Sequence, residues 1–272
     1  MMNVWIRGRL GSLVVVLIVA GAISGCAATG GGDMNSGVQP TADTTGNESD
    51  ARNRARIHTE LAGGYFGLGN LGVALEEVRV AQQSDPGYAT VYGVAGLIYA
   101  ALKDDRRAEE NFIRGLQLSP ADPDVNHNFG SFLCERKREA EGIKYLLAAV
   151  QNPLYQTPDR SLANAGVCAR RNGDDAAAQD LLQRALTVNP NQPLALLQLA
   201  ELSFAANNFA AAQGYLRRYA QVAPASSEIL WLALRVERKL GNALAEASYA
   251  QQLRKNYPES KEAAALQAGR FE

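Results

Sequence analysis

The chain has 272 residues, enough for one large domain or two small ones. Hydrophobic residues make up 47% of it and charged residues 20%, which is ordinary for a globular protein. The formal net charge of −1 excludes the strong basic excess of nucleic-acid-binding proteins, and it provides no field to steer a strongly charged partner.

The first 25 residues have the pattern of an export signal. Arg7 and Arg9 form a short basic region, and an apolar stretch of 14 residues follows at 10–23. That stretch is too short for a comfortable membrane span, and its length is typical of a signal peptide. We therefore assign residues 1–25 to a signal peptide that is removed from the folded protein.

A lipidation motif ends this stretch. Ile23-Ser24-Gly25-Cys26 resembles the bacterial lipobox, in which an aliphatic residue and two small residues precede a cysteine. In lipoproteins the peptidase cuts before that cysteine, whose thiol carries diacylglycerol, so the resemblance makes Cys26 the expected lipidation site. An uncleaved anchor helix and an ordinary signal peptide cut elsewhere are the alternatives. The residue after the cysteine is Ala27, whereas an aspartate there often retains lipoproteins in the inner membrane. The resemblance therefore implies that this protein lies on the periplasmic face of the outer membrane.

Residues 26–50 are predicted to be the lipidated cysteine and a flexible tether. The segment is rich in Gly, Ser, Thr, Asn and Asp and has almost no large apolar side chain. Such a composition cannot bury enough surface to offset the entropy lost on ordering. A flexible coil of about 25 residues spans roughly 25–30 Å, which would let a folded domain reach a partner near the membrane.

Five prolines mark a repeat in the rest of the chain. Pro86 and Pro120 are 34 residues apart, and so are Pro190, Pro224 and Pro258 in turn. A period of 34 is typical of the tetratricopeptide repeat (TPR), a pair of helices joined by a turn. The interval between the two groups is two periods plus two residues. The predicted repeats are 55–88, 89–122, 123–156, 159–192, 193–226 and 227–260, with an insertion at 157–158.

Two further positions of the repeat support this register, because small residues let two helix axes approach closely. The eighth residue is small in the first five repeats: Ala62, Gly96, Gly130, Gly166 and Ala200. The twentieth is small as well: Ala74, Ala108, Gly142, Ala178 and Ala212. The sixth repeat departs with Leu234 and Glu246, as a terminal repeat can. We predict an all-α fold over 51–272, a right-handed superhelical solenoid of six TPRs with a C-terminal capping helix.

No motif in the chain indicates catalysis. The sequence has no H-E-x-x-H, CxxC, Walker loop or G-x-S-x-G pattern, and its two histidines, His58 and His127, fall in different repeats. We therefore expect no enzyme activity, no metal and no cofactor.

Cys134 and Cys168 remain after the predicted lipid cysteine. Both fall in the C-terminal half of first helices that stack side by side, in the third and fourth repeats. A disulfide between them is favoured by an oxidising periplasm, where exported proteins tend not to keep unpaired thiols. Two buried cysteines that act as small apolar packers are the alternative.

The first helices of a TPR array line its concave face. In the N-terminal half this face carries small side chains, which leave room for an extended or helical segment of a partner. The predicted contact residues are Arg56, Thr59, Gly63, Phe66, Thr90, Gly93, Leu97, Asp124, His127 and Ser131. Phe66 and Leu97 would supply apolar contacts to the partner. Core packing between repeats is an equally good explanation for these two residues and for Phe204 of the fifth repeat. Trp231 is either an interface anchor or a cap for the last repeat, with capping slightly favoured.

Two motifs carry a resemblance to a known family. One is the run Asn-His-Asn-Phe-Gly-Ser-Phe-Leu-Cys at 126–134; the other is Asn-Pro-Leu-Tyr at 152–155, followed by Asn-Ala-Gly-Val-Cys at 164–168. With six repeats behind a lipobox, they resemble the type IV pilus biogenesis/stability lipoproteins, the pilotins of the pilus secretin. The resemblance implies a lipid-anchored outer-membrane protein that binds the secretin subunit and promotes its multimerisation, without nucleic acid or a small-molecule substrate. A generic periplasmic TPR scaffold for envelope or outer-membrane protein assembly is the alternative.

Overall fold

The computed structural model describes residues 49–271, which form thirteen helices and no strand. The predicted signal peptide, Cys26 and most of the predicted tether lie outside these described residues. The helices are α1 (Asp50–Gly67), α2 (Leu71–Ser84), α3 (Ala89–Ala101), α4 (Asp105–Leu118), α5 (Pro123–Glu135), α6 (Glu139–Gln151), α7 (Pro158–Arg171), α8 (Asp175–Val188), α9 (Pro193–Ala205), α10 (Phe209–Val222), α11 (Ser227–Lys239), α12 (Ala243–Asn256) and α13 (Lys261–Gln267).

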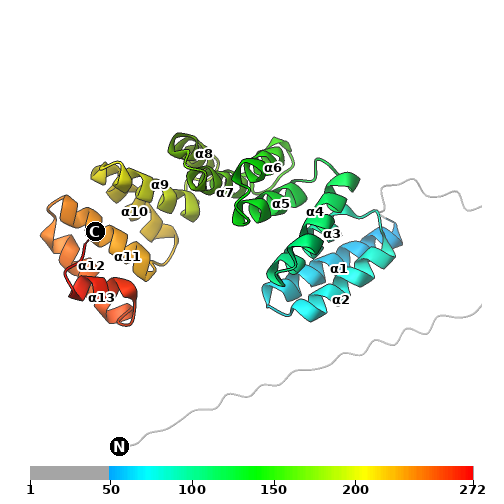
Figure 1. Cartoon of the computed structure of the whole chain (residues 1–272), viewed down its shortest axis with the longest axis horizontal. Coiled ribbons are helices and arrows are strands. Elements are labelled where there is room, and N and C mark those ends of the chain that lie inside the picture. Colours follow the sequence, from blue (N-terminus) through cyan, green and yellow to red (C-terminus); the bar gives the residue numbers. More distant parts are fainter. Residues whose placement is uncertain (1–48, 272) are drawn as a thin grey trace, which may run out of the picture. The chain divides into compact units, whose positions relative to one another are not determined.

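The helices pair in sequence, α1 with α2 through α11 with α12, and each pair is one predicted repeat. Figure 1 shows the pairs following one another along the folded unit, with α13 after the last pair. First helices begin at 89, 123, 193 and 227, which are the predicted repeat starts. The prediction of a TPR solenoid is thereby confirmed. No helix among the described residues is both long and apolar enough to span a bilayer.

Each repeat turns at its fifteenth residue, which has a left-handed backbone conformation. These residues are Gly69, Lys103, Lys137, Gly173, Asn207 and Gly241, with φ between 59° and 81°. A left-handed residue is a common way to end a helix, because it lets the next amides reach the last carbonyls. In four repeats an Asp or Asn then caps the second helix by accepting a backbone N–H bond, at Asp104, Asp174, Asn208 and Asn242.

The small residues at the eighth and twentieth positions allow the two helices of a repeat to touch. A Cβ added to Gly96 would lie 2.6 Å from the Phe112 ring, and one added to Gly130 would lie 2.7 Å from the Gly142 carbonyl. Leu146 and Phe112 are themselves fully buried. The register predicted from small residues therefore has a steric cause, since larger side chains at these glycines would push the paired helices apart.

Three cross-links join α5 to α7 at the boundary of the third and fourth repeats. His127 Nδ1 lies 2.7 Å from Ser161 Oγ, and Asn164 donates to Ser131 Oγ at 3.0 Å. A disulfide joins Cys134 to Cys168, whose Cα atoms are 5.7 Å apart. These contacts lie along one side of α5, so the motif residues of this region hold two repeats together.

The connection that contains the two-residue insertion is fixed by polar contacts. The Asn152 amide donates to the Ala121 carbonyl at 2.9 Å, and the Asn152 side-chain oxygen accepts from the backbone of Leu154. Tyr155 is buried, and its hydroxyl accepts from Ser161 at 3.0 Å. The Asn-Pro-Leu-Tyr motif thus builds a defined turn between α6 and α7.

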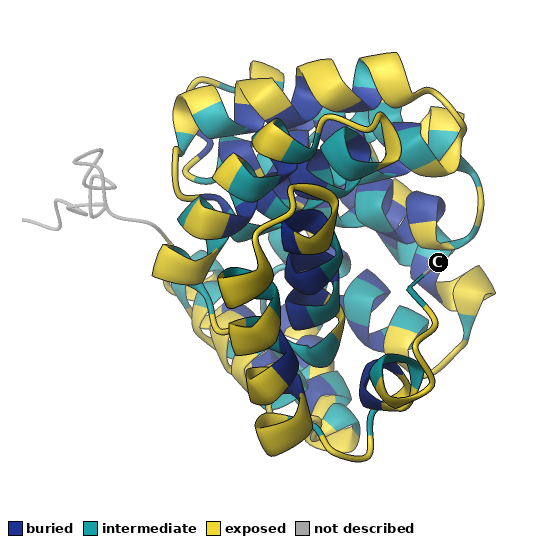
Figure 2. Ribbon diagram, turned by 90° about the vertical axis from the view of Figure 1, so that its left-hand side faces the viewer, coloured by how far each residue is buried: buried dark blue, intermediate teal, exposed yellow. Residues whose placement is uncertain are grey.

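The last repeat is closed by α13. Leu230 of α11, Leu253 of α12 and Ala263 of α13 form a small buried cluster against which Trp231 packs. Leu234, a departure from the small-residue pattern, is fully buried, whereas Glu246 forms an ion pair with Arg238 at 2.9 Å. Figure 2 shows buried residues on the sides that the helices turn toward one another and exposed residues on the outside.

Candidate protein-binding surfaces

The structure places three of the predicted groove residues inside the protein, so we withdraw them as surface contacts. Thr59 is buried, and its hydroxyl donates to the Ala55 carbonyl one helical turn earlier at 2.7 Å. Gly93 is buried where an added Cβ would lie 3.0 Å from Val125. His127 is occupied by Ser161 at the α5–α7 junction. In each case the neighbouring turn or repeat covers the side expected to face a partner.

Phe66 and Leu97 lie half-buried against two different core clusters. Phe66 packs on the cluster that includes Ala62 and Ile98, and Leu97 packs on the cluster centred on Phe112. Both residues therefore contribute to packing between repeats. A charge at either position would disturb the fold as well as a surface.

The other predicted groove residues are at least partly exposed. Asp124 is exposed, and Gly63 and Thr90 are half-buried. Arg56 donates to Glu60 and to Asn53 at 2.7 Å each. Ser131 accepts from Asn164, as described above. Polar contacts within α1 and between the third and fourth repeats therefore engage Arg56 and Ser131.

The outer face of α1 carries apolar side chains that every later repeat buries. The third and seventh positions of repeats two to six hold ten residues in all. Nine of these are hydrophobic and at most 9% exposed, and the remaining one, Ser161, is fully buried. In the first repeat the same positions hold Ile57 and Leu61, which are 44% and 43% exposed. The difference has a simple cause: each later first helix is covered by the preceding repeat, and α1 contacts only α2 and α3 among the described helices.

These side chains frame a shallow hollow on α1, which we call the α1 face. It has a volume of about 380 Å³ and is lined by Ile57, Glu60, Leu61, Gly64, Tyr65 and Leu68. Its apolar residues recur at three- and four-residue spacing, as on a helix that packs against another helix. The residues predicted from the sequence lie on first-helix positions of the concave face and do not include this surface. The signal was present in the sequence, because Ile57 and Leu61 occupy repeat positions that carry inter-repeat packing elsewhere.

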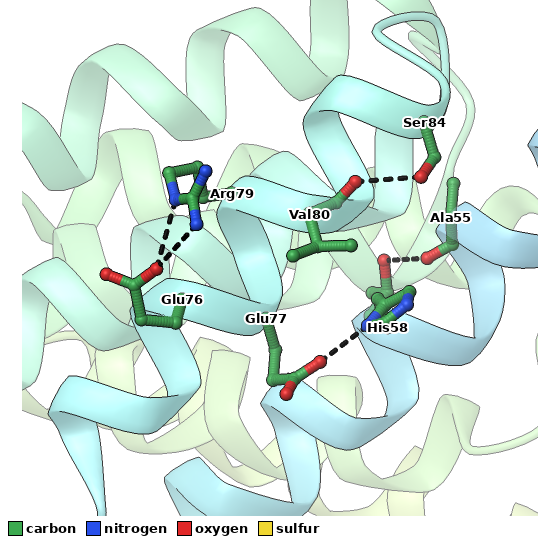
Figure 3. A network of polar contacts seen from close by, with 8 residues as sticks. Ala55, His58, Glu76, Glu77, Arg79, Val80 and Ser84 are labelled. Carbon is green, nitrogen blue, oxygen red and sulfur yellow. Dashed lines mark hydrogen bonds and ion pairs between the residues drawn. The ribbon is translucent and has the colours of Figure 1, made fainter.

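Polar contacts with the second helix hold α1 in place. His58 Nδ1 of α1 lies 2.5 Å from Glu77 Oε2 of α2, on a half-buried flank of the pair (Figure 3). Beside it, Glu76 and Arg79 pair along α2 (Figure 3). The α1 face therefore lies on a helix that is fixed against α2 before a partner binds. Less entropy is lost on binding because this helix is already ordered.

A second hollow lies at the other end of the array, between α9, α11 and α13; we call it the C-terminal groove. It has a volume of about 700 Å³, and Arg170 and Glu201 form an ion pair on its wall. Phe204, Trp231 and Arg235 line it as well. These residues come from first helices, at positions that face inward in successive repeats. Aromatic side chains, bordered by charges, are typical of a protein-binding groove.

The described residues contain no group of three or more His, Cys, Asp or Glu side chains placed to hold a metal ion. The buried hydrogen-bonded set of His127, Ser161 and Tyr155 links two repeats. Burial, with a further contribution from the charge of Arg160, lowers the pKa of His127 to about 4.

Models of the tetratricopeptide repeat family match residues 89–122 and 169–235. The type IV pilus assembly protein PilF of Pseudomonas aeruginosa is 28% identical over 254 residues, which are 93% of this chain and 97% of that protein. A solved structure of P. aeruginosa PilF matches with a TM-score of 0.75 and 27% identity, over 81% of this chain and all of that chain.

The crystal structure of PilW, a widely conserved type IV pilus biogenesis factor, is 32% identical to this chain. It matches with a TM-score of 0.70 and covers 78% of this chain and 98% of that chain. A likeness at 14% identity to a chain of the APC/C Cut9–Hcn1 tetramer, with a TM-score of 0.65 over 80% of this chain and 43% of that chain, concerns the fold alone. This chain belongs to the family of type IV pilus biogenesis TPR proteins that includes PilF and PilW.

Proposed function

We propose that this protein binds the type IV pilus secretin subunit through the α1 face. By this binding it promotes assembly of the secretin multimer, as a lipoprotein anchored through Cys26 on the periplasmic side of the outer membrane. Family membership supports a role in pilus biogenesis, and the lipobox-like sequence supports the anchor. The observation that carries the choice of site is the exposure of Ile57 and Leu61, whose repeat equivalents are all buried.

The partner segment should be an amphipathic helix. The α1 face occupies the place where a preceding repeat would lie, so a helix stacked there would continue the packing that the array repeats five times. Burying the exposed part of Ile57 and of Leu61 contributes roughly 1 kcal/mol each. Leu68, which is exposed further along α1, extends the contact. Glu60, within the same hollow, already pairs with Arg56 at 2.7 Å, so the apolar side chains are the groups that a partner helix would contact.

The position of α1 in the chain also fits this role. It is the first described helix and directly follows the predicted tether, so among the described helices it is the nearest in sequence to the predicted anchor. A binding surface at that end suits a partner that must itself insert into the membrane.

A pair of substitutions tests the proposal. Ile57→Asp with Leu61→Asp places two carboxylates on the α1 face, and we expect secretin co-purification and secretin multimers to be lost. Truncating an apolar interface anchor costs about 1–4 kcal/mol, and a buried unpaired charge costs more. The matched control is Leu154→Asp with Leu244→Asp, which changes two leucines that are 79% and 87% exposed elsewhere in the chain.

Circular dichroism and thermal melting of both double variants establish that they fold. A folded Ile57/Leu61 variant that still assembles normal secretin multimers would place the contact elsewhere. Loss of multimers in the control as well would show that the effect is not specific to the α1 face. An unaffected control beside a defective α1 variant is the expected result.

A further inference from the structure

The end of the described chain packs on two residues that line the C-terminal groove, Trp231 and Arg235. Gly269, with φ of +66°, ends α13, and the Arg270 amide then donates to the Ala265 carbonyl at 3.0 Å. This turn returns Phe271 to α11. The Phe271 ring stacks on Trp231, with centroids 5.6 Å apart and planes 17° from parallel.

Two arginines complete the seat of this phenylalanine. Arg235 donates from Nε to the Phe271 carbonyl at 3.0 Å, and the Arg238 guanidinium lies 3.8 Å from the centre of the Phe271 ring. The aromatic side chain is thus in contact with a cation as well as with the indole, and its backbone is held by a hydrogen bond. Trp231, Arg238 and Arg235 together bind an aromatic side chain that has a hydrogen-bond acceptor next to it.

The returning segment fills only one end of the groove. Phe271 contacts residues of α11, whereas Arg170 and Glu201 of the far wall pair with each other. A groove of about 700 Å³ falls within the range that takes a ligand of drug size or a short peptide. Phe204 lies along the unoccupied part, with the Arg235 guanidinium 4.6 Å from its ring centre.

Three cations and three carboxylates line the groove: Arg170, Arg235, Lys261, Glu201, Glu228 and Glu262. An acidic ligand is therefore favoured only beside a cation that has no carboxylate partner. Arg170 already has Glu201 as its partner, and Lys261 lies near Glu262. Arg235 has a backbone carbonyl and an aromatic ring as its contacts in the described part of the chain, with no carboxylate among them. A carboxylate would make a stronger, charge-assisted hydrogen bond to the same guanidinium.

We propose that the C-terminal groove is a second protein-binding site, and that Phe271 occupies it until a partner displaces it. The ligand is an extended segment of another protein in which an aromatic side chain stands next to an acidic group. Its ring takes the place of Phe271 on Trp231, and its carboxylate binds Arg235. This site is separate from the α1 face and does not depend on the proposed function.

Tryptophan fluorescence gives a direct test. The chain has two tryptophans, Trp5 and Trp231, so the protein from residue 27 onward, which contains every described residue, reports on Trp231 alone. In Phe271→Ala the indole loses its stacked ring, and we expect its emission to shift to the red while the circular dichroism is unchanged. Unchanged emission would overturn the claim that Phe271 covers Trp231.

Binding is measured by fluorescence anisotropy with labelled synthetic peptides. The probe Gly-Ser-Gly-Phe-Glu is compared with Gly-Ser-Gly-Ala-Glu, which lacks the ring. We expect the Phe271→Ala protein to bind the first probe about tenfold more tightly than the unchanged protein does, because the competing segment is gone. Adding Arg235→Gln should weaken binding about tenfold, whereas adding Arg79→Gln, on the distant α2, should not.

Three results would contradict the proposal. These are no binding of the phenylalanine probe to the Phe271→Ala protein at millimolar concentration, equal binding of the alanine probe, and equal binding after Arg235→Gln. A melting curve for each variant separates a lost contact from a lost fold.

Discussion

The imidazole of His127 lies between α5 and α7, where Ser161 and Tyr155 extend its hydrogen bond into a short chain. The ring is buried, and the charge of Arg160 opposes a second positive charge. Both effects favour the neutral ring, with burial the larger of the two. The residue therefore stabilises the fold only while it stays unprotonated.

This gives a defined pH dependence of stability. The pKa of His127 is about 4 in the folded chain, below the value near 6.5 expected when the chain is unfolded, so the unfolded chain binds the proton more readily. The contribution is complete above about pH 6.5 and falls by roughly 3 kcal/mol as the pH drops to about 4. Urea denaturation at the two pH values measures it.

The matched comparison is His127→Gln against His58→Gln, since these replace the only two histidines of the chain. Stability of the His127 variant should lose the part of the acid dependence that the His58 variant keeps. Parallel pH profiles for the two variants would show that His127 does not control this transition.

At the scale of helices, the 34-residue period predicted most of the fold. The spacing of Pro190, Pro224 and Pro258 is set by the helix pair itself, so repeat boundaries could be derived without knowing any contact. Contacts between repeats were harder to derive. Thr59, Gly93 and His127 all hold the fifth position of their repeats, which is buried in the first four repeats and half-buried at Leu197 and Trp231 in the last two, so burial there depends on how neighbouring helices stack. The sequence period predicts where a residue lies within its repeat, but it does not predict the angle at which neighbouring repeats stack.

The two proposed binding surfaces also differ in how much of each the repeat pattern predicts. The inward positions of the later repeats could be listed from the sequence, and the structure gathers Phe204, Trp231 and Arg235 into one groove. The return of Phe271 depends on a left-handed turn at Gly269, which follows the last repeat and has no periodic signal. The α1 face is exposed because no described helix packs on that side of α1. The repeat pattern alone gives the positions of Ile57 and Leu61 but does not show that they are exposed.

The link between α5 and α7 is expected to contribute measurably to stability. A disulfide between Cys134 and Cys168 closes a loop of 34 residues, and the chain-entropy model assigns it about 3–4 kcal/mol. Reductant should lower the denaturation midpoint of the unchanged protein and leave that of a Cys134→Ser, Cys168→Ser variant where it is. Mass spectrometry without reductant should find the two peptides linked, and free alkylation of both thiols under denaturing conditions would contradict the bond.

For the whole molecule, the proposed function requires the folded repeats to be at the membrane. The proposed lipid on Cys26 supplies this anchor, because two or more acyl chains hold a protein stably where one does not. Cys26→Ala should abolish palmitate labelling and move the protein out of the outer-membrane fraction. The Cys134→Ser, Cys168→Ser variant is the control for loss of a cysteine and should keep both properties. Unchanged labelling and fractionation of Cys26→Ala would contradict the anchor.

Site-specific crosslinking in cells tests the proposed contact between the α1 face and the secretin subunit. A photoreactive phenylalanine analogue is placed at Leu61, and in a second strain at Leu244, which is exposed on α12. We predict a light-dependent adduct with the secretin subunit from position 61 and none from position 244. An adduct from position 244 alone, or none from position 61 in cells that assemble pili, would contradict the account.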